Sequence, residues 1–279
     1  MRKKFKFSPK LGLFIFLILS LGFLVLNREN ISAWGGHSKG RKQPPAVEKN
    51  KIVFVIDDIG YHLQEEVRLT KLGDKVTYAI LPLLPYSKYF GNLSRKTGAE
   101  VILHMPLEAM DGTVPGRGLI TRAMTPEHVL KMVDTDLSSV PNHSGSNNHM
   151  GSLGTSDPAL MKIILTDIKR RGLFYLDSYT SSDSVVVPVA QEIGLPVLRR
   201  DVFLDNIDAK QAIRDQIKQL KSISRKKGYA IAIGHYRTNT LEVLIQDIPE
   251  LEREGFEIIS LQQLLDYLGK KKLSPATPV

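Results

Sequence analysis

Four short apolar runs in this chain each end on an aspartate or a histidine. They are residues 52–56 before Asp57 and Asp58, 101–103 before His104, 173–176 before Asp177, and 229–234 before His235. Continuous apolar runs rich in β-branched residues are typical of parallel strands buried on both faces. In barrels of alternating strands and helices, catalytic groups lie where such strands end. The four ends therefore predict one active site, and carboxylates together with imidazoles suggest a divalent metal.

Helical segments separate these runs. We expect helices at 64–72, 86–96, 125–139, 159–171, 208–225 and 239–254, and further strands at 76–81, 196–198 and 256–259. Thr125 before Pro126 is a typical helix start, and Asp157 before Pro158 repeats it. Strands that alternate with helices indicate parallel βα units, so the chain belongs to the α/β class. Seven or eight such units predict a closed or nearly closed barrel.

The N-terminus has the pattern of an export signal. Residues 1–10 are basic, and residues 11–26 form a continuous apolar segment. This segment is short for a membrane-spanning helix of about 20 residues and slightly long for the apolar part of a cleaved signal, about 7–15 residues. A cleaved signal peptide and a membrane anchor helix both remain open. Either one places the rest of the chain in the periplasm or another extracytoplasmic space.

The remaining chain divides into three parts. Residues 27–50 are rich in Gly, Pro, Ser and Lys and are expected to form a flexible basic linker. Residues 51–268 hold the strand and helix pattern of the barrel, and residues 269–279 are expected to be a disordered tail.

The distribution of charge and the absence of cysteine limit the expected partners and the types of metal ligand. Residues 1–51 hold eleven Lys or Arg against two Glu, which accounts for the whole net charge of +9 and leaves the rest of the chain neutral. A nucleic-acid partner is not expected, because phosphate binding needs basic residues clustered on the folded surface. The chain has no cysteine, so any metal must be held by nitrogen and oxygen ligands.

The polar strand ends have functional and plain interpretations. Repulsion between the adjacent carboxylates of Asp57 and Asp58 would be offset by a cation or a shared proton, although the pair could simply cap a helix. Pro106 is expected to end its strand, so that His104 and Glu108 turn toward the strand mouth. His104 could also be a structural histidine. His149 lies in the polar stretch 147–151, which we interpret as a loop.

Together these residues favour metal-dependent hydrolysis. One Asp and two His suit a divalent ion such as Zn, Ni, Co or Fe and leave room for water. A bound water then becomes acidic enough to attack a carbonyl. The second Asp and the third His remain available for proton transfers.

Another charged segment follows the strand at 196–198. It contains Arg200, Asp201 and Asp205, which form either a solvated ion-pair cluster or a shell that orients Asp57 and His235. Asp177 has the same two interpretations.

These motifs, in this order, resemble the divergent polysaccharide deacetylases, a branch of the NodB-type carbohydrate esterase superfamily. The motifs are Ile56-Asp-Asp-Ile-Gly60, His104-Met-Pro-Leu-Glu108, Asn147-Asn-His-Met-Gly151, Leu176-Asp-Ser178, Arg200-Asp-Val-Phe-Leu-Asp205 and Gly234-His235. The resemblance covers residues 51–268 and implies a distorted (β/α) barrel. It also implies that Asp57 is the general base, Asp58 and His104 are metal ligands, and His235 is the general acid.

One motif departs from the family's standard pattern. The standard second motif supplies two histidines four residues apart, whereas the residue four positions after His104 is Glu108. His149 is the expected replacement ligand. A donor to the oxyanion would come from backbone N–H groups near Asn147 or Asn148.

The sequence thus predicts an exported metal-dependent hydrolase that removes N- or O-linked acetyl groups from an envelope polysaccharide. Zinc is the expected ion, an acetylated polysaccharide or oligosaccharide the expected partner, and the N-terminal segment the expected membrane contact. The alternative is a non-catalytic, metal-containing envelope protein that binds a glycan or a protein.

Overall fold

The computed structural model describes residues 48–273. The predicted signal or anchor segment at 11–26, most of the linker and the end of the C-terminal tail lie outside these residues. Within residues 48–273, no helix is long and apolar enough to cross a membrane.

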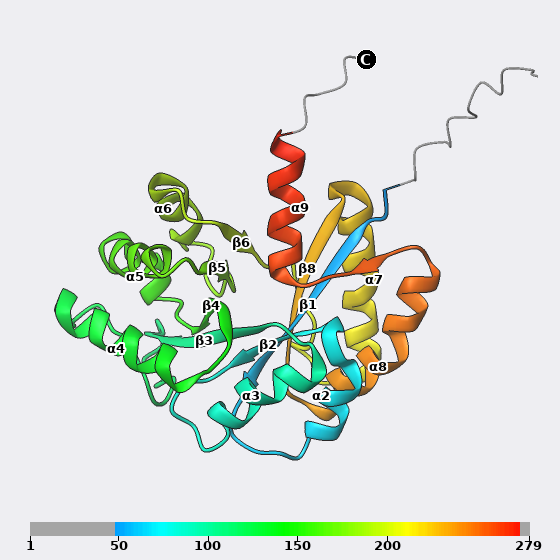
Figure 1. Cartoon of the computed structure of the whole chain (residues 1–279), viewed down its shortest axis with the longest axis horizontal. Coiled ribbons are helices and arrows are strands. Elements are labelled where there is room, and N and C mark those ends of the chain that lie inside the picture. The colour runs from blue at the N-terminus through cyan, green and yellow to red at the C-terminus, as the bar shows by residue number, and fades with distance from the viewer. Residues whose placement is uncertain (1–47, 274–279) are drawn as a thin grey trace, which may run out of the picture. The chain divides into compact units, whose positions relative to one another are not determined.

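Eight parallel strands form a continuous sheet that curls into a half-barrel (Figure 1). The strands, with a short ninth, are β1 (Lys51–Ile59), β2 (Thr77–Ile80), β3 (Val101–Leu107), β4 (His143–Met150), β5 (Phe174–Asp177), β6 (Val197–Arg199), β7 (Val202–Phe203), β8 (Tyr229–His235) and β9 (Glu257–Ile258). Their hydrogen-bonded order is β6-β5-β4-β3-β2-β1-β8-β7, and β9 pairs with the start of β1. The predicted α/β fold of parallel strands and alternating helices is confirmed. The sheet is a half-barrel, because β6 and β7 lie at the two ends of the strand order and do not pair with each other.

Helices alternate with the strands along the chain. They are α2 (Glu66–Leu72), α3 (Ser87–Thr97), α4 (Pro126–Ser139), α5 (Pro158–Arg170), α6 (Val186–Ile193), α7 (Lys210–Lys227), α8 (Thr238–Arg253) and α9 (Leu261–Leu273). The two helix starts predicted at Thr125 and Asp157 are confirmed. The Thr125 side chain accepts from the backbone N–H of His128, and the Asp157 carboxylate caps α5.

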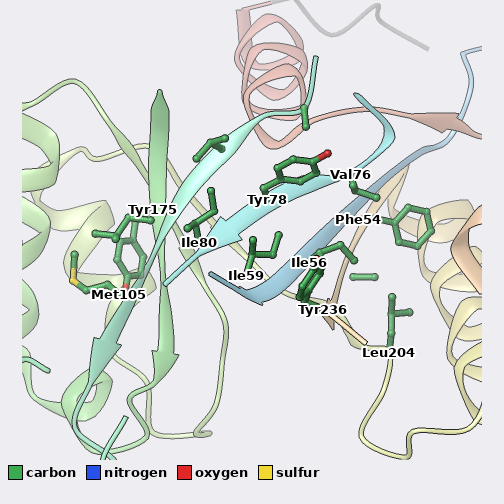
Figure 2. Close-up of a cluster of buried hydrophobic side chains, with 14 of the residues drawn as sticks. Phe54, Ile56, Ile59, Val76, Tyr78, Ile80, Met105, Tyr175, Leu204 and Tyr236 are labelled. Atoms are coloured by element: carbon green, nitrogen blue, oxygen red, sulfur yellow. The ribbon is translucent and has the colours of Figure 1, made fainter. Parts of the chain in front are cut away.

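The two faces of the sheet bury different side chains, because successive residues of a strand point to opposite faces. On the outer face, Phe54, Ile56 and Tyr78 pack among apolar residues of helices α2 to α8 (Figures 1 and 2). On the inner face, Val53 and Val55 pack in a second cluster with leucines of α9. The sequence interpretation did not identify α9, whose leucines pack against this inner-face cluster.

Two local predictions were wrong. Strand β3 does not end at Pro106, because it continues to Leu107 and Pro106 pairs with His149 of β4. The polar stretch 147–151 is not a loop, since residues 147–150 form the end of β4. This polar strand is stable in the middle of the sheet because its buried side chains are hydrogen-bonded, as the Ser146 hydroxyl is to the Leu103 carbonyl.

Candidate metal centre

The two-residue period of the strands places the polar side chains on the inner face of the half-barrel. Asp57 continues the inner series of Val53 and Val55, His104 follows Ile102, and His235 follows Ile233. Each polar side chain therefore lies one step beyond an apolar layer, at the carboxyl end of its strand. The four separate sequence motifs become neighbours because the strands are parallel.

Asp58 departs from this alternation. Its φ angle is 63°, in the left-handed region, and the pairing of β1 with β2 is irregular at this point. A non-glycine residue held in this region costs on the order of 1–3 kcal/mol. The turn brings a second carboxylate to the same face as Asp57, where regular strand geometry would have placed the two on opposite faces.

Asp58, His104 and His149 form a compact set of possible metal ligands. Asp58 Oδ1 lies 3.3 Å from His104 Nε2 and 3.1 Å from His149 Nδ1, and the two nitrogens are 3.1 Å apart. Zinc ligands at about 2.0–2.1 Å from a tetrahedral ion are about 3.3 Å from one another. The three atoms thus have the spacing of one face of a coordination shell.

A second observation fits a cation at this position. Asp58 Oδ1 is buried and has no donor in hydrogen-bonding geometry, although buried carboxylate oxygens normally have one. Burial alone would raise the pKa of Asp58, but the imidazoles of His104 and His149 outweigh it and hold that pKa well below its usual range. An ionised carboxylate and two imidazoles are a donor set suited to zinc and to similar divalent ions.

Asp57 and His104 are connected through Asn147, whose side chain was not among the predicted site groups. Asn147 accepts a hydrogen bond on Oδ1 from His104 Nδ1 at 2.8 Å, and its Nδ2 donates to Asp57 Oδ1 at 2.9 Å. The free Asp57 oxygen, Oδ2, is 3.5 Å from His104 Nε2. Burial raises the pKa of Asp57. The alternation of Asn147 with His149 on β4 is the signal that could have identified Asn147.

His235 faces the opposite side of the Asp58 carboxylate. Its Nε2 is 3.8 Å from Asp58 Oδ2, and its Nδ1 is 2.8 Å from Asp205 Oδ1. The other Asp205 oxygen accepts from the backbone N–H of His235 and from the Thr240 hydroxyl. Burial lowers the pKa of His235, but the Asp205 carboxylate outweighs it and raises that pKa.

The other predicted site residues lie around this centre in different roles. Arg200 donates to the carbonyls of Ser178 and Tyr179 in the loop after β5. Asp177 accepts from the Tyr179 backbone N–H and the Ser184 hydroxyl in that loop. Both residues shape the loop and are not among the candidate metal ligands.

Three further residues make contacts away from the candidate ligands. Glu108 accepts from the Arg122 backbone N–H. Asn148 points to the face opposite Asn147 and accepts from the Ser178 backbone N–H. Asp201 binds Lys227 and the Ile231 backbone N–H. These contacts stabilise loops and strand connections.

A known protein family and several known proteins match most of the described residues. The sequence profile of a family described as divergent polysaccharide deacetylase matches residues 54–265. An uncharacterized protein of Haemophilus influenzae is 35% identical over 205 residues, which cover 72% of this chain and 73% of that protein. The uncharacterized protein YibQ of Escherichia coli is 28% identical over 228 residues, covering 82% and 70%.

A solved structure shares the fold. The uncharacterized protein ATU2773 of Agrobacterium tumefaciens has a TM-score of 0.75 and 21% sequence identity, over 80% of this chain and 92% of that one.

Proposed function

The chain belongs to the divergent polysaccharide deacetylase family, and we propose that it is a metal-dependent hydrolase that removes N- or O-linked acetyl groups from an envelope polysaccharide. The observation that carries this proposal is the triangle of possible ligand atoms formed by Asp58 Oδ1, His104 Nε2 and His149 Nδ1, which are 3.1–3.3 Å apart. Asp57 and His235 each lie within 4 Å of that triangle's residues. A metal set with a carboxylate and an imidazole beside it can hydrolyse an acyl group by activating water and moving the protons.

Asp58, His104 and His149 would hold the ion. Zinc is the first expectation, and nickel, cobalt and iron suit the same ligands. When bound, a divalent ion supplies the Lewis acidity that activates water and polarises an acyl carbonyl.

Asp57 and His235 divide the proton transfers. Asp57 accepts a proton from the attacking water through Oδ2, and burial supports this role because it raises the pKa of the carboxyl. His235 donates a proton from Nε2 to the departing sugar nitrogen or oxygen. Asp205 supports this role because it raises the pKa of His235 and so favours the charged imidazole. The acyl C–N or C–O bond breaks, and the products are acetate and a free amine or hydroxyl.

The substrate would approach over the loops that follow the strands. Exposed apolar side chains occur on three of these loops, with Tyr61 after β1, Met110 and Val114 after β3, and Ile207 after β7. An aromatic ring such as that of Tyr61, about half exposed, offers a flat surface to a sugar ring. The Tyr61 ring therefore supports a carbohydrate substrate.

We also propose an extracytoplasmic location. The basic residues 1–10 and the apolar residues 11–26 support export, with the apolar segment acting as a cleaved signal or as a tether to the membrane. The barrel would then meet polysaccharide outside the cytoplasm.

Acetate release tests this proposal. The purified full-length chain, loaded with Zn²⁺, is incubated with N-acetylglucosamine oligosaccharides, peptidoglycan strands and an O-acetylated glycan. We expect acetate from at least one of them, and in Asp57→Asn a loss of about 10²- to 10⁴-fold with the metal retained. Asp201→Asn makes the same chemical change outside the site and should keep wild-type turnover.

Two results would contradict the proposal. Unchanged turnover in Asp57→Asn would exclude Asp57 as the base. A fully metal-loaded chain that releases no acetate from any of these glycans would favour a glycan- or protein-binding role.

A further inference from the structure

Asn147 is fully buried and joins the proposed base to a proposed metal ligand. Its exposed fraction is 0%, and both ends of its side-chain amide are used. Nδ2 donates to Asp57 Oδ1 and Oδ1 accepts from His104 Nδ1, at 2.9 and 2.8 Å. Such contacts constrain the groups at both ends.

The direction of these bonds follows from the chemistry of the partners. An ionised Asp57 carboxylate can only accept hydrogen bonds, so it must meet the NH₂ end of the Asn147 amide. The amide oxygen then faces His104 Nδ1, which must carry its proton there. The lone pair of His104 is consequently on Nε2, the nitrogen that faces Asp58 Oδ1 and His149 Nδ1.

We infer that Asn147 is a positioning residue that fixes the His104 tautomer for metal binding and, through the same amide, the orientation of the Asp57 carboxylate. The inference deepens the proposed function and rests on its metal site. An amide suits this position because it is neutral. A Lys or Arg at the same place would orient Asp57 but would also add positive charge beside the ligands of a cation.

Asn148 provides a matched control. It has the same side chain, follows Asn147 on β4 and is nearly as buried, with 1% exposed. Its amide points to the other face, where Oδ1 accepts from the Ser178 backbone N–H and Nδ2 donates to the Met150 carbonyl. A loss that comes only from removing a buried amide from β4 would appear in both positions.

The test measures metal binding without substrate. The full-length chain is stripped of metal, and Zn²⁺ affinity is measured by competition with a chromophoric chelator. The visible spectrum of bound Co²⁺ reports the coordination geometry. We expect Asn147→Leu to bind Zn²⁺ about 10- to 100-fold more weakly and to change the Co²⁺ spectrum. Asn148→Leu should lower the melting temperature but keep the wild-type affinity and spectrum.

Asn147→Asp separates the two ends of the amide and serves as the test if Asn147→Leu does not fold. It keeps an acceptor for His104 Nδ1 but replaces the donor to Asp57 with a second carboxylate. We expect Zn²⁺ affinity at or above that of the wild type, with acetate release reduced at least about tenfold.

The outcomes distinguish the two proposals. Wild-type Zn²⁺ affinity in Asn147→Leu, or wild-type turnover in Asn147→Asp, would overturn the inference while leaving the proposed function intact. A wild-type chain that binds no Zn²⁺ would remove the proposed function and this inference with it.

Discussion

The pairing of Asp205 with His235 can be tested by a substitution that changes charge but not shape. Asp205→Asn leaves one acceptor oxygen where the carboxylate has two. In the wild type, one oxygen lies 2.8 Å from His235 Nδ1, and the other accepts from the His235 N–H at 2.7 Å and from Thr240 Oγ1 at 2.6 Å. The amide cannot satisfy all three donors.

The magnitude and its pH dependence follow from the two pKa shifts. Burial lowers the pKa of His235, but Asp205 raises it overall. The contribution of the pair to the free energy of unfolding is therefore complete below the pKa of histidine in the unfolded chain, and it is lost as the pH rises through the pKa of His235 in the folded chain. Burial raises the pKa of Asp205, but His235 lowers it overall, so the stabilisation is lost as the pH falls through that folded pKa. It is therefore largest between about pH 4 and 6.5. A charge-assisted hydrogen bond contributes about 1.5–3 kcal/mol, and the pair is at most 17% exposed.

Urea unfolding of the full-length chain, with EDTA present, measures this contribution. We expect Asp205→Asn to lower the free energy of unfolding by about 1.5–3 kcal/mol near pH 5.5 and by clearly less near pH 9. Asp201→Asn is the control, because Asp201 also accepts from a β8 backbone N–H but pairs with a lysine, Lys227, in place of a histidine. An equal loss at both pH values in Asp205→Asn would refute the charged pairing.

Two further substitutions test burial. Asp136 is buried with neither carboxylate oxygen hydrogen-bonded, and burial raises its pKa to about 8. The free energy of unfolding should therefore fall by up to about 1.4 kcal/mol per pH unit between the unfolded pKa of about 3.9 and the folded value. Asp136→Asn should remove this slope. The prediction would be contradicted if the melting temperatures of the two chains changed in parallel from pH 5 to 8. Gly145→Ala places a Cβ 2.6 Å from the Phe174 ring inside the half-barrel, and we expect a loss of about 1–3 kcal/mol in urea unfolding, whereas wild-type stability would show that the ring has room to move.

The sequence predicts most of the fold because its strands are apolar and their ends are polar. Runs such as 52–56 and 230–234 are buried on both faces, so their composition alone identifies them. Asp57, His104 and His235 come together because parallel strands carry their ends to one edge. His149 was expected as a ligand from the family resemblance alone, and the structure places it beside Asp58 and His104.

The parts that were missed have contacts that no local pattern records. Strand β4 resembles a loop in sequence because it contains Ser, Asn and His. It is stable as a strand because hydrogen bonds to neighbouring strands satisfy these polar side chains. The role of the Asn147 side chain was missed for the same reason. Glu108 was a candidate from its spacing, but the actual path of β3 and the loop beyond it brings its carboxylate to Arg122.

The metal content of the purified full-length chain tests the proposed centre most directly. After reconstitution with Zn²⁺, we expect about one ion per chain, lost in Asp58→Ala and His149→Ala and retained in Glu108→Ala. Absence of metal from the wild-type chain, or its retention in both ligand variants, would contradict the metal site and the hydrolase built on it.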